Sequence, residues 1–225
     1  MDDIYVDYYT PCPNVYDFRA DSITYSMVKL IWDTFNYQQQ GYQISYLLEG
    51  DSLNNETIIN FNDTIINFPY QINGLNPASN YRIGIRQNCG SNWAYINIIT
   101  KGAPATLPYY CDFSSVNERN AWEISNGNAP NKWFIGQAVN QSPIEGYSLY
   151  VSQDNGLNNT YYFGALVSQG ASTVVASRLF EVSGAGGYTL SFNSRIGGEI
   201  NFDYLKVFLV DEDVVFTGSS TRPDF

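Results

Sequence analysis

The chain contains no histidine among its 225 residues. Histidine is the usual general base at neutral pH, a member of serine and cysteine catalytic triads, and the commonest metal ligand. Its absence excludes most familiar hydrolase chemistry and every histidine-based metal site. We therefore expect a protein that is not an enzyme.

Charged residues are also scarce, at 15% of the chain, and the net charge is −11. An acidic surface repels phosphate backbones, so nucleic acid is not an expected partner. No run approaches the roughly 18 apolar residues of a spanning helix, so membrane insertion is not expected either. The N-terminal residues 1–4 lack the basic and apolar segments of a signal peptide.

Aromatic residues are abundant, at 16% of the chain with 19 tyrosines and 13 phenylalanines, and they favour strands over helices. Between residues 15 and 100, short alternating segments follow one another with turn signals between them. Alternation places Val28, Leu30 and Trp32 on one face of one segment, and Tyr42 and Ile44 on one face of the next. This pattern predicts an all-β fold with an antiparallel sandwich.

Five residues in this region carry a resemblance to a known family: Trp32, Tyr42, Leu75, Pro77 and Tyr81. Their order and spacing resemble those of a fibronectin type III module, over residues 11–101. The resemblance implies that the tryptophan fills the space between two sheets. It also implies that the hydroxyl of the last tyrosine bonds to backbone in a tyrosine corner.

The cysteines are Cys12, Cys89 and Cys111, and none lies in a Cys-x-x-Cys motif, so a zinc site is not expected. In the fibronectin type III topology the first strand begins near the loop after the sixth strand. The resemblance therefore implies a disulfide between Cys12 and Cys89, which would indicate an exported protein. The alternative is a pair of buried reduced thiols.

Gly, Pro and small residues at 102–107 predict a linker. Beyond it, the order of landmarks resembles the cleaved-adhesin or choice-of-anchor J jelly-roll modules of secreted Bacteroidetes proteins, which are related in outline to MAM domains. The landmarks are Asp112-Phe113, Trp122, residues 131–136, residues 148–156, Tyr188–Phe192 and residues 203–207.

The expected organisation is thus an N-terminal extension at 1–10, a fibronectin type III domain at 11–101, the linker, and a jelly-roll adhesin-like domain at 108–225. Such modules usually run on to a closing segment that is absent here, so we expect the second sandwich to be incomplete at its C-terminus. The rest of a larger parent chain is then an expected partner.

Asp112, Asp154 and Asp203 are the candidate ligands of a structural Ca²⁺ ion, since sandwich modules of this kind often clamp their loops with calcium. The alternative is an ordinary Asn-Gly turn with solvated carboxylates.

Tyr161, Tyr162 and Phe163 follow a polar loop and are the candidate exposed surface for binding sugar rings. Trp133 and Tyr150 alternate with the strand period, which favours positions in the core. The acidic cluster at 211–213 is interpreted as a solvated turn, because neighbouring strand residues face opposite ways and cannot form the carboxylate pair of a glycosidase.

These features predict non-catalytic binding or adhesion modules of a secreted or cell-surface bacterial protein, with a glycan or an extracellular protein as partner. The alternative is a pair of accessory domains in a larger secreted peptidase or glycoside hydrolase.

Overall fold

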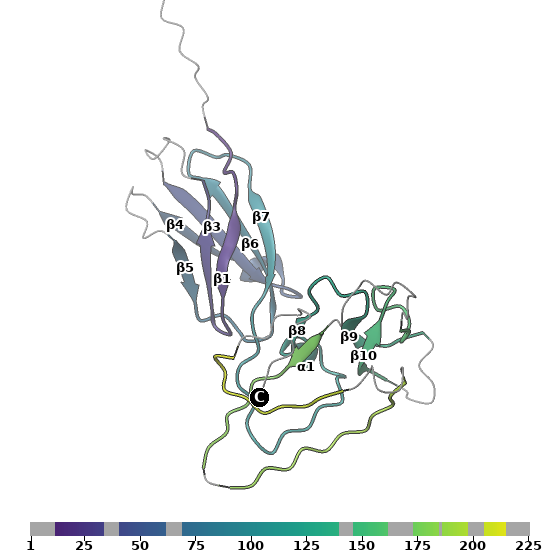
Figure 1. Ribbon diagram of the computed structural model, residues 1–225. Helices are drawn as coiled ribbons and strands as arrows, with labels where there is room; N and C mark the ends of the chain where they lie inside the picture. Colours follow the sequence, from purple (N-terminus) through teal and green to yellow (C-terminus); the bar gives the residue numbers. More distant parts are fainter. Residues whose placement is uncertain are drawn as a thin grey trace, which may run out of the picture. The chain divides into compact units, whose positions relative to one another are not determined.

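A computed structural model describes residues 12–33, 41–61, 69–139, 146–161, 173–184, 186–197 and 205–214. The chain divides into two compact units, Met1–Ala103 and Pro104–Phe225. Nearly all regular structure in the described residues is β-strand (Figure 1). The predicted all-β fold class is confirmed.

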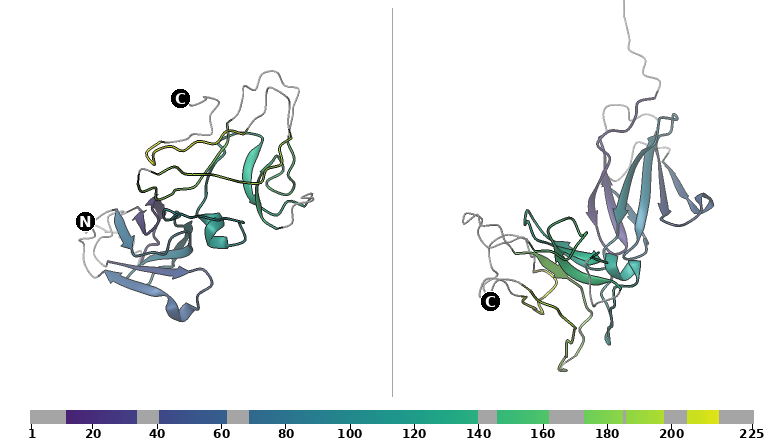
Figure 2. Two further views of the ribbon diagram at one scale, coloured as in Figure 1. Left: turned by 90° about the horizontal axis from the view of Figure 1, so that it is seen from below. Right: turned by 90° about the vertical axis from the view of Figure 1, so that its right-hand side faces the viewer.

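Unit 1, residues 1–103, contains two antiparallel sheets, whose strands are seen from two further sides in Figure 2. The three-stranded sheet has the order β1-β2-β5, with β1 at Arg19–Ile23, β2 at Met27–Ile31 and β5 at Tyr70–Asn73. The four-stranded sheet has the order β4-β3-β6-β7, with β3 at Tyr42–Leu48, β4 at Thr57–Phe61, β6 at Asn80–Gln87 and β7 at Ala94–Ile99. A short 3-10 helix at Leu53–Asn55 precedes β4.

The core of unit 1 follows from alternation along these strands. Val28 and Leu30 are fully buried in β2, and Ile44, Ile83 and Ile85 are fully buried in β3 and β6. Each is flanked by residues of the opposite face, as the two-residue period of a strand requires. Burial of these apolar side chains is the main force that holds the two sheets together.

The aromatic positions of the fibronectin type III pattern occupy the expected places. Trp32 directly follows the second strand, is buried, and packs edge-on against Tyr42 with ring centroids 5.4 Å apart. Tyr42 opens the third strand, and Tyr81 lies in the sixth. The hydroxyl oxygen of Tyr81 accepts a 2.9 Å hydrogen bond from the backbone N–H of Asn76, which forms the tyrosine corner. Unit 1 is therefore a fibronectin type III-like β-sandwich.

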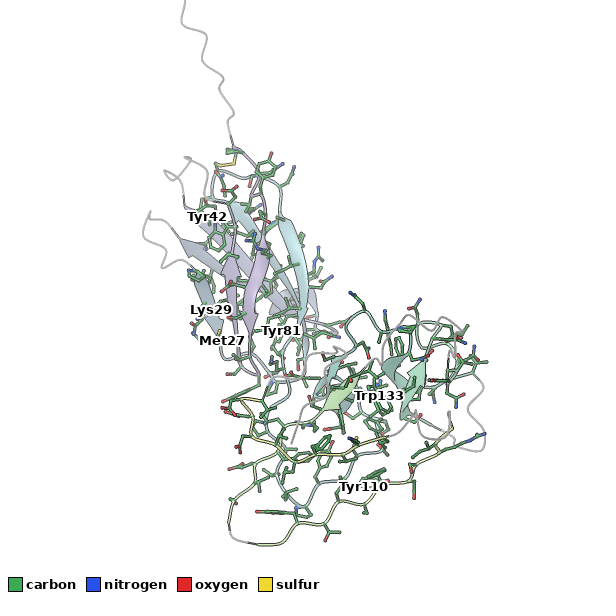
Figure 3. All side chains as sticks on the ribbon, viewed as in Figure 1. Met27, Lys29, Tyr42, Tyr81, Tyr110 and Trp133 are labelled. Carbon is green, nitrogen blue, oxygen red and sulfur yellow. A yellow bond between two sulfur atoms is a disulfide. The ribbon has the colours of Figure 1, made fainter. Side chains whose placement is uncertain are left out.

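A disulfide joins Cys12 to Cys89, with 5.6 Å between the two Cα atoms. It lies at the end of the sandwich that carries Tyr42, whereas Tyr81 lies toward the other end (Figure 3). The crosslink closes a loop across a sequence separation of 77 residues. In the chain-entropy account a loop of this size contributes about 4 kcal/mol by restricting the unfolded chain. Cys111, in unit 2, is a half-buried free thiol.

Unit 2, residues 104–225, contains two antiparallel strand pairs among its described residues. One pair is β9 (Lys132–Gly136) with β10 (Ser148–Ser152), and the other is β8 (Glu123–Ser125) with β11 (Val175–Ser177). Trp133 and Tyr150 lie in the first pair and are half-buried. An isolated bridge between Ala105 and Phe180 shows that the start of this unit already pairs with a later segment.

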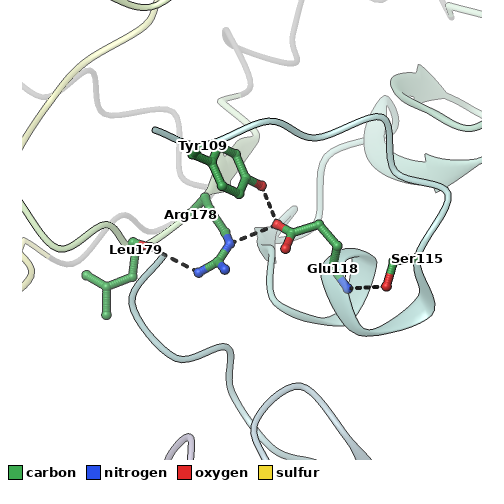
Figure 4. Close-up of polar contacts among 5 residues, drawn as sticks. All are labelled: Tyr109, Ser115, Glu118, Arg178 and Leu179. Atoms are coloured by element: carbon green, nitrogen blue, oxygen red, sulfur yellow. Dashed lines mark hydrogen bonds and ion pairs between the residues drawn. The ribbon is translucent and has the colours of Figure 1, made fainter. Parts of the chain in front are cut away.

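A short helix that alternation did not indicate, α1 at Val116–Asn120, begins after Ser115. The Ser115 hydroxyl accepts a hydrogen bond from the Glu118 backbone N–H, so the Ser-x-x-Glu spacing is the signal for this helix start. The Glu118 carboxylate also accepts hydrogen bonds from the Tyr109 hydroxyl and from Arg178 Nε, the latter at 3.0 Å (Figure 4). Burial, together with the bond to Glu118, raises the pKa of Tyr109. This carboxylate thereby ties three segments of unit 2 together.

The sequence predicted further strands at Tyr188–Phe192 and at residues 202–209, and this prediction is wrong for the described part. Neither Tyr188–Phe192 nor residues 205–209 belong to a strand, and Leu190 and Leu209 are strongly exposed. Alternation of apolar and polar residues indicates only a local preference for an extended strand, whereas a β-sheet also needs a neighbouring strand to pair with. The assignment of unit 2 to a jelly roll that is incomplete at its C-terminus stays a prediction.

Candidate binding face on the four-stranded sheet

The candidate site is the outward face of the four-stranded sheet of unit 1. In β6 the odd positions Tyr81, Ile83 and Ile85 are buried, and the even positions Arg82 and Arg86 are not. The same alternation turns the side chains of Tyr95 and Asn97 outward from β7, while Ile98 is buried. The core sequence therefore fixes which side chains this face displays.

Strand register aligns the outward side chains in three rows across the sheet. Gln43 lies opposite Asn60 on one side and opposite Arg86 on the other. The next row places Gly84 between Ser45 and Tyr95, and the third places Arg82 between Leu47 and Asn97. We refer to these three rows, together with Trp93 directly before β7, as the ladder face.

Hydrogen bonds connect the first row across three strands. The Gln43 amide nitrogen donates to Asn60 Oδ1 at 2.7 Å, and Gln43 Oε1 accepts from Arg86 Nε at 2.6 Å. Because the amide uses its donor on one side and its acceptor on the other, it fixes the direction of the Arg86 side chain.

Two aromatic rings support the two guanidinium groups. The guanidinium carbon of Arg86 lies 4.7 Å from the ring centroid of Trp93, and that of Arg82 lies 3.9 Å from the centroid of Tyr95. The two rings stack on each other, with centroids 6.0 Å apart and an interplanar angle of 25°. Cation–π contacts at exposed sites each contribute about 0.5 to 1 kcal/mol, so the four side chains restrain one another.

Gly84 makes room for this arrangement. A Cβ atom at Gly84 would lie 2.6 Å from Tyr95 Cε1 and 2.9 Å from Ser45 Oγ, both closer than real contacts allow. The absence of a side chain lets the Tyr95 ring lie against the backbone of β6, beneath Arg82. Glycine inside a strand often marks such a close approach.

The ladder face is positively charged on an acidic chain. Its three rows contain two arginines and no carboxylate. In the adjoining row, Glu49, directly after β3, accepts a hydrogen bond from the side chain of Asn80 in β6, and Glu56 lies directly before β4. No described residue accepts a hydrogen bond from Arg82 or from the terminal nitrogens of Arg86, and neither arginine forms an ion pair with a described residue. Within the described part of the chain, these donors therefore have no side-chain or backbone acceptor.

The sequence analysis did not find this face. Its signal is the alternation Arg82-x-Gly84-x-Arg86 in one segment and Trp93-x-Tyr95-x-Asn97 in the next. Each run shows only that polar and aromatic residues point away from the core. That the two runs lie side by side, and that Gln43 bridges to both Asn60 and Arg86, depends on strand register.

Two of the three aspartates proposed for calcium, Asp112 and Asp154, lie within the described residues, and each is bonded within its own turn. Asp112 accepts a hydrogen bond from the Ser114 backbone N–H, which lowers the pKa of this exposed carboxyl group. Hydrogen bonds from the Ser152 hydroxyl and from Asn158 lower the pKa of Asp154 to about 2. Asp203 lies outside the described residues.

Among the described residues, no cluster of three or more Cys, Asp or Glu side chains is arranged to hold a metal ion. The bonds of Asp154 close the turn at residues 152–158 through protein donors. The calcium site stays a prediction, because one of its three members is not described.

Of the three aromatic residues proposed to bind sugar rings, the structure describes only the first. Tyr161 is half-buried, and Tyr162 and Phe163 lie outside the described residues, so that surface also stays a prediction. The acidic cluster at 211–213 forms an exposed turn, closed by a hydrogen bond from the Val214 N–H to the Asp211 carbonyl at 3.2 Å. This confirms its interpretation as a solvated turn.

No helix within the described ranges has the length and hydropathy needed to cross a bilayer. No family model matches the chain, and no curated protein matches it.

Several solved structures are similar to part of the chain. The fibronectin type III domain of human contactin 1 is 18% identical, with a TM-score of 0.38, over 49% of this chain and 93% of that domain. The corresponding domain of the human collagen alpha-1(XX) chain is 17% identical, with a TM-score of 0.35, over 42% of this chain and 89% of that domain. A computationally redesigned β-sandwich protein is 14% identical, with a TM-score of 0.35, over 41% of this chain and 94% of that one. The fold assignment of unit 1 rests on its own strand order, core and tyrosine corner.

Proposed function

We propose that the chain is a non-catalytic binding segment of an exported protein, and that the ladder face binds an extracellular protein. The observation that carries the proposal is the restrained group of Trp93, Tyr95, Arg82 and Arg86 on an outward sheet face. Tryptophan, tyrosine and arginine are the residues most enriched where protein interfaces concentrate their binding energy. Nothing in the core of unit 1 requires them at these positions.

The Cys12–Cys89 disulfide supports the extracellular part of the proposal. Disulfides persist in oxidising compartments and are rare in the cytosol. We therefore expect the partner to be an extracellular molecule, either a protein or a glycan. The exposed isoleucines Ile58 and Ile99 favour a protein, because they offer apolar contact at the margins of the face.

The test measures binding of the whole chain to a panel of immobilised extracellular matrix proteins and, in a second arm, to a glycan array. We expect at least one protein to bind, and the Trp93→Ala variant to bind it at least about tenfold more weakly, as is typical of a central interface aromatic. Tyr25→Ala is the matched control, because Tyr25 is an exposed aromatic outside the ladder face. Binding that Trp93→Ala leaves unchanged, or binding only to glycans, would contradict the proposal.

A catalytic role is tested separately by turnover of casein and of polysaccharides. Ser26 and Lys29 have the Ser-x-x-Lys spacing, but Ser26 lies directly before β2, and among the described residues no hydrogen bond joins the two side chains. We expect no turnover. Reproducible activity that survives repurification would overturn the non-catalytic assignment.

A further inference from the structure

We infer that the partner bound by the ladder face presents carboxylates, and that its contact segment is an acidic stretch of protein. This inference rests on the proposed function and specifies the chemistry of its partner. The juxtaposition that carries it is two supported guanidinium groups, Arg82 and Arg86, on a face whose rows contain no carboxylate.

The Arg86 guanidinium is held ready for an anion. Its Nε is occupied by Gln43, and its plane lies over Trp93, so the terminal nitrogens are the donors that remain. Arginine donors in a fixed fork match the two oxygens of a carboxylate. Since the side chain is already restrained, less conformational entropy is lost when the ligand binds.

The covering of the rings argues against a neutral ligand that stacks on aromatics. Arg82 lies over the ring of Tyr95, and Tyr95 and Trp93 stack on each other. A neutral sugar would have to displace a guanidinium group to reach that ring face. A carboxylate can instead bind the edge of the guanidinium group, so the cation–π contact between that group and the ring stays in place.

The charge balance of the chain points the same way. Acidic residues outnumber basic ones by 22 to 11, yet the three rows of the ladder face carry two arginines and no carboxylate, and Glu49 of the adjoining row is already bonded to Asn80. An acidic partner is repelled by most of the chain and attracted to this face, which gives the encounter its orientation. The two arginines are four residues apart in β6, roughly 14 Å between Cα atoms in a strand. In an extended peptide with glutamates at every second position, alternate glutamates are four residues apart and therefore lie at the same spacing of roughly 14 Å.

The experiment uses NMR titration of the whole isotope-labelled chain with two synthetic peptides. One peptide alternates Glu and Ser, and its neutral counterpart alternates Gln and Ser. We expect the Glu–Ser peptide to shift the Arg86 Nε–H and Trp93 indole signals, and the Gln–Ser peptide to leave them in place. Raising the salt from about 0.1 M to about 1 M should abolish the shifts, because the Debye length falls from roughly 10 Å to roughly 3 Å.

The variants Arg82→Gln and Arg86→Gln should each weaken binding of the Glu–Ser peptide about tenfold, as expected for a hydrogen bond to a charged group. Lys29→Gln is the matched control, because it removes the same charge from the other sheet (Figure 3). It should change the affinity less than twofold.

Three results would overturn the inference: equal binding of the two peptides, an equal loss on Lys29→Gln, or preferential binding of polygalacturonate, which carries carboxylates on a sugar chain. Failure of the inference can be separated from failure of the proposed function. If a matrix protein binds with dependence on Trp93 but not on either arginine, the ladder face is a binding face for a neutral partner.

Discussion

The two faces of strand β6 differ in what they require of the sequence. Ile83 and Ile85 point inward and are completely buried, so their identity follows from the need to fill the space between two sheets. Arg82, Gly84 and Arg86 alternate with them and are free of that need, yet they are held in a connected arrangement with Trp93 and Tyr95. The core does not require this connected arrangement of outward side chains, and for that reason we propose that the face binds a partner.

The largest effect is expected from a substitution on the inward face. Ile83→Ala removes a fully buried side chain and leaves a cavity, which should lower the free energy of unfolding by about 3 kcal/mol. Ile99→Ala is the control, because Ile99 is 51% exposed on the outward face of β7. Its cost should stay under about 0.5 kcal/mol in urea unfolding. Equal losses of unfolding free energy in the two variants would contradict the assignment of Ile83 to the core and Ile99 to the outward face.

An intermediate effect on stability is expected at Gly84, where the ring of Tyr95 lies against the backbone of β6. Gly84→Ala places a Cβ atom against the Tyr95 ring and should cost about 1 kcal/mol of stability, since the ring must leave its place under Arg82. In a Tyr95→Ala background the same change should cost less, because only the close contact with the Ser45 hydroxyl remains. An undiminished cost in the double variant would show that the ring is not the obstacle.

A smaller effect on affinity is expected at Gln43, which acts through Arg86. Gln43→Ala removes the acceptor for Arg86 Nε and the donor to Asn60. We expect the affinity for the Glu–Ser peptide to fall about threefold, because Arg86 must then be ordered on binding. Gln71→Ala is the control, since Gln71 bonds Asn73 on the other sheet. A purely structural role would instead lower the unfolding midpoint without altering affinity.

Much of unit 1 could be predicted from the sequence, because its features are indicated by local alternation or by motifs with a characteristic spacing. Alternation identified Val28, Leu30 and Trp32 as core, and the Leu-x-Pro-x-x-x-Tyr spacing identified the tyrosine corner at Tyr81. The bridge between Cys12 and Cys89, implied by the resemblance, is present in the structure.

The ladder face could not be predicted in the same way. The Gln43–Arg86 hydrogen bond joins residues 43 positions apart, and it exists only because β3 and β6 pair in one register. Changing that register by one residue would turn Gln43 away from Arg86. In unit 2, alternation at Tyr188–Phe192 suggested a strand for which the described residues supply no partner.

The most direct test of the binding face compares affinity and stability in a single variant, Arg86→Gln. We expect its thermal unfolding midpoint to stay close to that of the unsubstituted chain, since an outward substitution costs under about 0.5 kcal/mol. Its affinity for the Glu–Ser peptide should fall about tenfold in the same preparation. A variant that keeps full affinity, or one that loses affinity only in step with its stability, would contradict the account.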